Sequence, residues 1–225
     1  MATLAEIDSS SGVTSDTTNP NVLVKHLLPH EWTLWCLCDI QTKGKGKYPQ
    51  NTAVYNFNTV EDFWAMYNNL KKPSEIALSV KTNIIFLRKD VKPEWEDTYN
   101  KDGGEWIVDF EKPSRSNGSL DKAWENTLLN VIGSSFKNSD DVAAIWLQIR
   151  PKGADKISLW NKTAQDETIC VGLGDEWVAM LENDCGVKKP GCGYFVHADS
   201  VRQAISKGGS FEAKPKHTIN AFRRK

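Results

Sequence analysis

The segment DVAAIWLQIRPKGADKISLWN, residues 141–161, decides the fold class. Residues 141–150 are apolar at alternate positions, which predicts a strand with one buried side. Residues 152–155, KGAD, are typical of a tight turn, and residues 156–161 are predicted to return as the hairpin partner. Strands joined by so short a turn pair antiparallel, so we expect a largely antiparallel sheet.

The rest of the chain adds more strands and three long helices. Apolar residues at helical spacing begin near Thr59, Ser119 and Ile169, where Thr59 and Ser119 are predicted helix caps. A shorter helix is expected from Asp199. Because each long helix has one apolar stripe, the three can cover only one face, which indicates an α+β fold with a curved sheet. The further strands are predicted at 32–38, 53–58, 83–88, 105–110 and 194–197.

Composition limits the classes of partner. The 225 residues carry 28 basic and 29 acidic side chains, a net charge of −1, which argues against non-specific binding of polyanions. No apolar run reaches the roughly 18 residues of a membrane span, and the N-terminus lacks a signal-peptide core. We expect a disordered tail over residues 1–21 and a single domain over 22–225 that ends in the basic tail 223–225.

Cysteine and histidine usage points away from stapled and metal-dependent folds. Five cysteines, an odd number, fit a reducing compartment, although Cys185 and Cys192 could pair if oxidised. No Cys/His spacing resembles a zinc site, so no metal and no cofactor are expected. The four histidines do not cluster with Ser, Cys or acids in a catalytic motif, which disfavours an enzyme. His197 is expected to be structural or to lie at a pocket rim.

The loop VKPEWED, residues 91–97, places the Trp95 ring directly beside the Glu96 carboxylate. Pro93 keeps this segment out of a regular helix or a central strand. A flat ring with an adjacent acceptor can read a flat ligand that has a donor edge, and a Trp face also attracts cations. For an isolated Trp-Glu pair, packing of Trp95 on the core with Glu96 solvated is the simpler interpretation.

Six motifs together resemble the cap-binding translation initiation factor 4E family. They are HLL at 26–28, WTLW at 32–35, TVEDFWAMYN at 59–68, PEWED at 93–97, GGEW at 103–106 and YFVHAD at 194–199. The resemblance covers about residues 25–199. It implies a curved sheet with three helices on its convex face and a pocket for the 7-methylguanosine cap of messenger RNA on its concave face.

The resemblance also assigns roles around the cap base. Trp95 looks like one stacking ring, Glu96 would accept from the base edge, and Trp160 matches the residue that contacts the N7-methyl group. Methylation makes the ring cationic, so two flanking aromatic faces would favour methylated guanine. The second ring departs from the family, because the nearest aromatic is Tyr48, where Trp is usual. Tyr48 could instead be a core or loop residue, and a stacking Tyr predicts weaker or altered cap affinity.

The cap phosphates need cations. Arg150 and Lys156 match the family's phosphate-binding pair, and Lys152 is expected to assist. Asp155 adds a negative charge to the same turn, and Glu105 replaces a basic residue that other family members use. Without the resemblance, residues of this kind would indicate only a solvated hairpin turn.

The convex face is the predicted partner site, where family members bind a scaffold protein or an inhibitor through a short helix. Leu27 stands where Pro is usual, and Glu125-Asn126 replaces Leu-Glu, which places partner choice in question. Trp64 is the exposed anchor expected of this site, although on spacing alone it would be a core residue. The residues that match the groove are His26, Val60, Trp64 and Leu129.

Three functions follow from these observations. The leading hypothesis is an initiation factor that binds capped messenger RNA and recruits it for translation. A cap-binding repressor or competitor is the alternative, because Tyr48 and the groove are altered and some family variants with Tyr in this place act as repressors. An enzyme acting on methylated nucleotides is the third. A monomer in the cytoplasm, with the nucleus as a second location, is expected.

Overall fold

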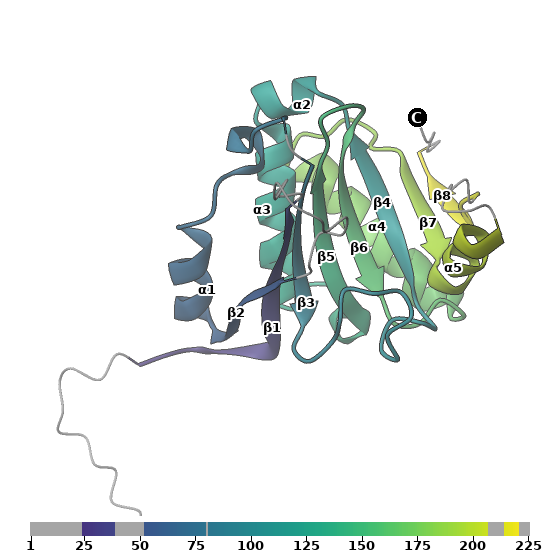
Figure 1. Cartoon of the computed structure of the whole chain (residues 1–225), viewed down its shortest axis with the longest axis horizontal. Helices are drawn as coiled ribbons and strands as arrows, with labels where there is room; N and C mark the ends of the chain where they lie inside the picture. The colour runs from purple at the N-terminus through teal and green to yellow at the C-terminus, as the bar shows by residue number, and fades with distance from the viewer. Residues whose placement is uncertain (1–23, 39–51, 80, 207–213, 221–225) are drawn as a thin grey trace, which may run out of the picture.

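The computed structural model describes residues 24–38, 52–79, 81–206 and 214–220, and within them eight strands form one sheet (Figure 1). Their order is β2-β1-β3-β5-β6-β4-β7-β8, and every neighbouring pair is antiparallel, as predicted. The strands are Leu27–Cys38 (β1), Thr52–Thr59 (β2), Thr82–Arg88 (β3), Gly104–Phe110 (β4), Val142–Ile149 (β5), Asp155–Asn161 (β6), Cys192–Val196 (β7) and His217–Ile219 (β8).

Helices cover one face of this sheet. In Figure 1, α3 and α4 lie behind the sheet, α1 lies beside the β2 edge and α5 lies near β7 and β8. Their bounds are Val60–Tyr67 (α1), Pro113–Ser116 (α2), Ser119–Ile132 (α3), Glu167–Asn183 (α4) and His197–Ser206 (α5), with short 3₁₀ turns at Pro73–Glu75 (η1) and Ser139–Asp141 (η2). The α+β class is therefore confirmed, although α2 and β8 were not predicted.

Two helix starts show how local residues set the boundaries. Thr59 caps α1 as predicted, since its hydroxyl accepts the Asp62 N–H at 3.2 Å. The predicted cap at Ser119 is wrong: Gly118 is the N-cap of α3, with a φ of 75°. Glycine takes this left-handed conformation at little cost, which lets the chain turn sharply from α2 into α3. The first helix is also only eight residues long, where a long one was expected.

The main core lies between the sheet and the helices, and tryptophans dominate it. Trp106 on β4 and Trp177 on α4 are both almost fully buried, and their indole N–H groups find acceptors. Trp106 donates to the Cys170 carbonyl at 2.7 Å, and Trp177 donates to the Thr127 hydroxyl at 2.9 Å. The first bond fixes α4 to the sheet and the second fixes α4 to α3, and neither indole is left as an unpaired buried donor.

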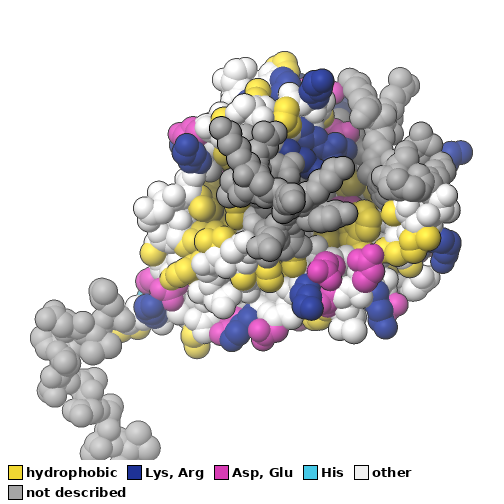
Figure 2. Space-filling view, viewed as in Figure 1, with side chains coloured by type: hydrophobic (Ala, Val, Ile, Leu, Met, Phe, Trp, Pro, Cys, Tyr) yellow, Lys and Arg dark blue, Asp and Glu magenta, His cyan; other side chains and the backbone are white. Residues whose placement is uncertain are grey.

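The face of the sheet away from α3 and α4, here called the open face, has its own smaller apolar cluster. Strand alternation explains it: on β6, Ile157 and Leu159 face the main core, so Lys156, Ser158 and Trp160 face the other way. Figure 2 shows hydrophobic side chains across the middle of the face toward the viewer, with Lys and Arg side chains gathered above them. The cluster contains Ile85, Leu87, Val91, Ala143, Ala144 and Trp160, with Trp35, Trp95, Tyr99 and Trp146 packed against it.

Several predictions fall beyond this part of the chain. The tail at 1–21, the basic end at 223–225 and Tyr48 lie outside the described residues. Among the residues that are described, Cys185 and Cys192 are free thiols, and burial raises the pKa of Cys185 to about 11. In the same ranges, no helix is long and apolar enough to cross a bilayer, and no three His, Cys, Asp or Glu side chains gather as a metal site would require.

Candidate functional site

The loop that joins β3 to β4 carries Trp95 and Glu96 onto the open face. Side chains of the loop hold its own backbone: the Asp97 carboxylate accepts the N–H groups of Lys92 at 3.2 Å and Tyr99 at 2.8 Å. Asn100 donates its amide to the carbonyls of Lys92 at 3.0 Å and Glu94 at 2.9 Å. This scaffold leaves Trp95 half-buried and Glu96 exposed to solvent.

His197, at the start of α5, connects this loop to the floor of the site. Its Nδ1 lies 2.8 Å from the Asn100 carbonyl oxygen, and its ring lies between Trp95, at 6.4 Å, and Trp160, at 4.6 Å between centroids. The side chain is fully buried, and burial lowers the pKa of His197 to about 4. His197 is therefore neutral at physiological pH and donates its Nδ1 proton to Asn100. The expected structural role fits this arrangement.

Trp160 forms the floor of the open face beside the loop. It is 1% exposed, packs on Trp146 at 5.4 Å between ring centroids, and donates its indole N–H to the Glu105 carboxylate at 3.0 Å. Glu105 is itself buried, on the neighbouring strand β4. From the sequence, Glu105 was expected only to lack the positive charge of the basic residue it replaces; the pairing of β4 with β6 brings it beside Trp160 on the open face.

The predicted phosphate residues lie at the β5–β6 turn but differ in availability. Arg150 is half-buried and donates to the Gln148 side-chain oxygen at 2.8 Å, while Lys152 is exposed in the turn. The side chain of Lys156 is only 6% exposed, and its ammonium group forms an ion pair with Asp109 at 2.8 Å. Arg150 and Lys152 therefore present more accessible charge than Lys156 does.

The expectation that Asp155 would oppose these cations needs correction. Its carboxylate is fully buried, since residue 155 alternates with Lys156 and faces away from the open face. It accepts the Arg150 backbone N–H at 2.9 Å and forms ion pairs with Lys112 at 2.8 Å and Arg115 at 3.5 Å. The negative charge of Asp155 is thus compensated locally and organises the turn.

The residues predicted for the partner groove lie on α1, on α3 and directly before β1. The Val60 N–H donates to the His26 carbonyl at 2.9 Å, and the His26 ring contacts the Glu61 carboxylate at 2.6 Å. Trp64 is half-buried one turn along α1, and Leu129 is 36% exposed on a separate helix, α3. Trp64 packs partly on the core yet keeps an accessible surface, so its position is compatible both with a core residue and with an anchor for a partner.

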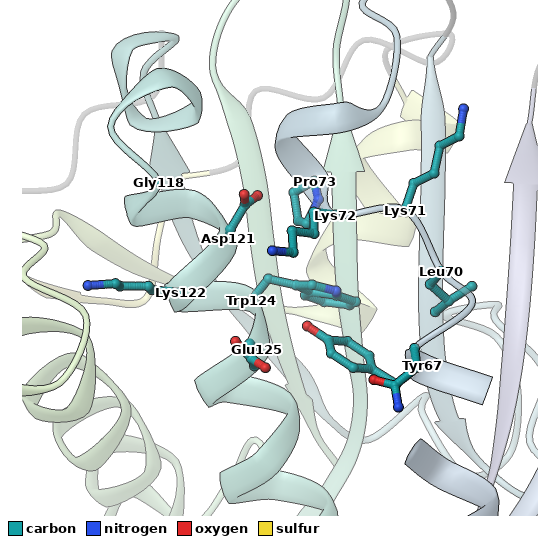
Figure 3. Close-up of a pocket in the computed structure, with 11 residues that line it drawn as sticks. Tyr67, Leu70, Lys71, Lys72, Pro73, Gly118, Asp121, Lys122, Trp124 and Glu125 are labelled. Atoms are coloured by element: carbon teal, nitrogen blue, oxygen red, sulfur yellow. The ribbon is translucent and has the colours of Figure 1, made fainter. Parts of the chain in front are cut away.

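A cavity of about 420 Å³ opens between the end of α1, η1 and the start of α3. Figure 3 shows Tyr67 and Trp124 facing each other, with Glu125 beside Tyr67 and Lys71 pointing away. Burial, with a contribution from the Glu125 charge, raises the pKa of the Tyr67 hydroxyl. The cavity belongs to the helical side of the molecule and not to the Trp95 site.

Comparison with known proteins relates this geometry to a family. The family model for eukaryotic initiation factor 4E matches residues 27–210. Eukaryotic translation initiation factor 4E allele A from Solanum tuberosum is 33% identical over 198 residues, 88% of this chain and 80% of the relative.

Solved structures agree. The structure of Ascaris suum eIF4E-3 with m7G cap superimposes with a TM-score of 0.72 at 27% identity, over 88% of this chain and all of that one. The complex of Caenorhabditis elegans eIF4E-3 with the 4E-binding protein Mextli and a cap analog gives a TM-score of 0.71 at 25% identity, over 87% of this chain and all of that one. The chain belongs to the eukaryotic initiation factor 4E family.

Proposed function

We propose that this protein binds the 7-methylguanosine cap of messenger RNA on its open face and recruits the capped message for translation initiation. The observation that carries the proposal is the loop that presents Trp95 and Glu96 together, braced by Asp97, Asn100 and His197. The Ascaris suum relative was solved with m7G cap, which supports the same ligand here. The relatives are named initiation factors, which favours initiation over repression.

The base is read by stacking and by charge. Trp95 provides one ring face, worth about 1 to 3 kcal/mol per stacked base and about 0.5 to 2 kcal/mol more for a cationic base. Glu96 accepts hydrogen bonds from the N1 and N2 donors of guanine, at about 1.5 to 3 kcal/mol for a charge-assisted bond. We place Trp160 at the N7-methyl group and Tyr48 as the second stacking ring.

The phosphates lie toward the β5–β6 turn in this proposal. Arg150 makes the main contact and Lys152 adds charge, because both have accessible side chains. Lys156 is a weaker phosphate contact in this proposal, because its buried ammonium group is already paired with the Asp109 carboxylate. Binding then depends on the base more than on the phosphate chain.

The helical face binds a partner in the same proposal. The Caenorhabditis elegans relative was solved with the 4E-binding protein Mextli, which supports a scaffold protein or inhibitor as the partner. Trp64 is the anchor residue, with His26, Val60 and Leu129 around it. We further propose a monomeric, non-enzymatic protein that acts in the cytoplasm and also enters the nucleus.

Retention on a 7-methyl-GTP resin tests the cap assignment. The wild-type protein should be retained and eluted by free 7-methyl-GTP. Trp95→Ala and Glu96→Ala should each pass through, because each removes one of the two base contacts, while Glu176→Gln on the helical face should be retained as the matched control. Retention of both loop variants would show that the base binds elsewhere.

A further inference from the structure

Glu105 is a buried carboxylate in the floor of the proposed cap site. It lies on β4 between β6 and β7, where it is paired in register with Trp160 on one side and Phe195 on the other. Only 4% of the residue is exposed. Its Oε2 accepts the Trp160 indole N–H at 3.0 Å, so the acid is directly coupled to the ring that forms the floor.

A carboxylate in this position changes what the Trp160 ring can bind. A hydrogen bond from the indole N–H to a carboxylate raises the electron density of the ring, and an electron-rich face attracts cations more strongly. A second effect adds to the first, since a carboxylate near a poorly solvated site attracts a cation directly. Both effects favour a positively charged base over a neutral base of the same shape.

The imidazole of His197, which also contacts Trp160, does not cancel the attraction of a cation to this site. His197 lies 4.6 Å from Trp160 between ring centroids, and burial lowers the pKa of His197 to about 4. The imidazole is therefore uncharged at neutral pH. The titratable side chains in contact with Trp160 thus include an acid, Glu105, and a neutral histidine, His197.

We propose that Glu105 is a positioning residue that sets the preference for N7-methylated over unmethylated guanine, acting through Trp160. This inference rests on the proposed cap-binding function. Glu105 would then have a function of its own in base selection, and would not merely be the loss of a basic residue that contacts the phosphates. An acid there shifts discrimination from the phosphate chain to the charge of the base.

Titration of the protein with 7-methyl-GTP and with GTP tests the proposal. The readout is the ratio of the two affinities, which a purely structural role would leave unchanged. Glu105→Gln keeps an acceptor for the indole but removes the charge, so it should lower this ratio roughly tenfold, as expected for a charge–ring interaction of ordinary size. Glu105→Asp keeps the charge and should preserve most of the ratio, and Glu176→Gln, far from Trp160 on α4, should leave it unchanged.

Each other outcome has a defined meaning. The inference is wrong if Glu105→Gln leaves the ratio of the two affinities unchanged. An equal increase in the affinity for both ligands, from weaker repulsion of the phosphates, would also contradict it. If wild-type protein binds neither ligand, the cap-binding proposal itself fails. Thermal unfolding identifies a variant that does not fold; in that case Glu105→Met, which has a similar length but no charge, must lower the same ratio for the inference to hold.

Discussion

Protonation of His197 should destabilise the folded protein. The imidazole is fully buried between Trp95 and Trp160, and its Nδ1 proton is donated to the Asn100 carbonyl. Burial disfavours the imidazolium form and lowers the pKa of His197 from 6.5 to about 4. In the unfolded chain the same group titrates at its ordinary value.

The sign and size of the effect follow from these two pKa values. Between pH 6.5 and pH 4 the unfolded state binds a proton that the folded state does not, so the free energy of unfolding falls as the pH falls. The loss begins near pH 6.5, is complete below about pH 4 and amounts to about 3 kcal/mol. Above pH 7, His197 is neutral in both the folded and the unfolded state, so it adds nothing to the pH dependence of the free energy of unfolding.

Urea unfolding of wild-type protein and of His197→Asn across pH 4 to 8 measures this contribution. Asparagine can donate to the Asn100 carbonyl but does not titrate in this range. The variant should be less stable at pH 7, by about 2 to 4 kcal/mol, because the ring is lost from between two tryptophans. Its stability should also depend less on pH than that of the wild type, since carboxylate contributions are common to both. Equal pH slopes for the two proteins would refute the assignment of a buried neutral histidine.

Three further outcomes test the packing, the partner face and the phosphate contact. Gly174→Ala should lower the free energy of unfolding by about 1 to 3 kcal/mol, because its new Cβ would lie 2.4 Å from a Trp106 ring atom; Gly172→Ala on the same helix meets no atom closer than 3.9 Å and should be neutral or stabilising in the same thermal melt. Trp64→Ala should weaken binding of a family scaffold peptide by about 2 kcal/mol or more in calorimetry while 7-methyl-GTP binding persists, and loss of both would indicate misfolding. Arg150→Gln should weaken 7-methyl-GTP roughly tenfold but 7-methylguanosine much less, and an equal effect on both would place the phosphates elsewhere.

The sequence was sufficient for the fold class because the decisive signals are local. Alternating apolar residues in 141–161 around a short turn predict an antiparallel hairpin, and the structure contains it as β5 and β6. The cap of α1 at Thr59 was predictable for the same reason. The cap of α3 was not, since Ser119 is a common cap residue and only the backbone shows that Gly118 takes the position.

The chemistry of the site depends on strand order, which no local pattern contains. Alternation places Glu105 and Trp160 on one face of their own strands, but their contact requires β4 and β6 to be neighbours in a specific register. The ion pair of Lys156 with Asp109 depends on the same pairing. In the folded protein, Asp109 therefore neutralises Lys156, and Glu105 orients Trp160.

Quenching of tryptophan fluorescence by 7-methyl-GTP and by GTP tests whether the open face binds the methylated base. Trp95 lies half-buried at the surface of the open face, so a base stacked on it should quench its emission. We expect saturable quenching by 7-methyl-GTP at concentrations where GTP has little effect, and loss of that quenching in Trp95→Ala. Equal quenching by both nucleotides, or unchanged quenching in the variant, would exclude a methylated base stacked on Trp95.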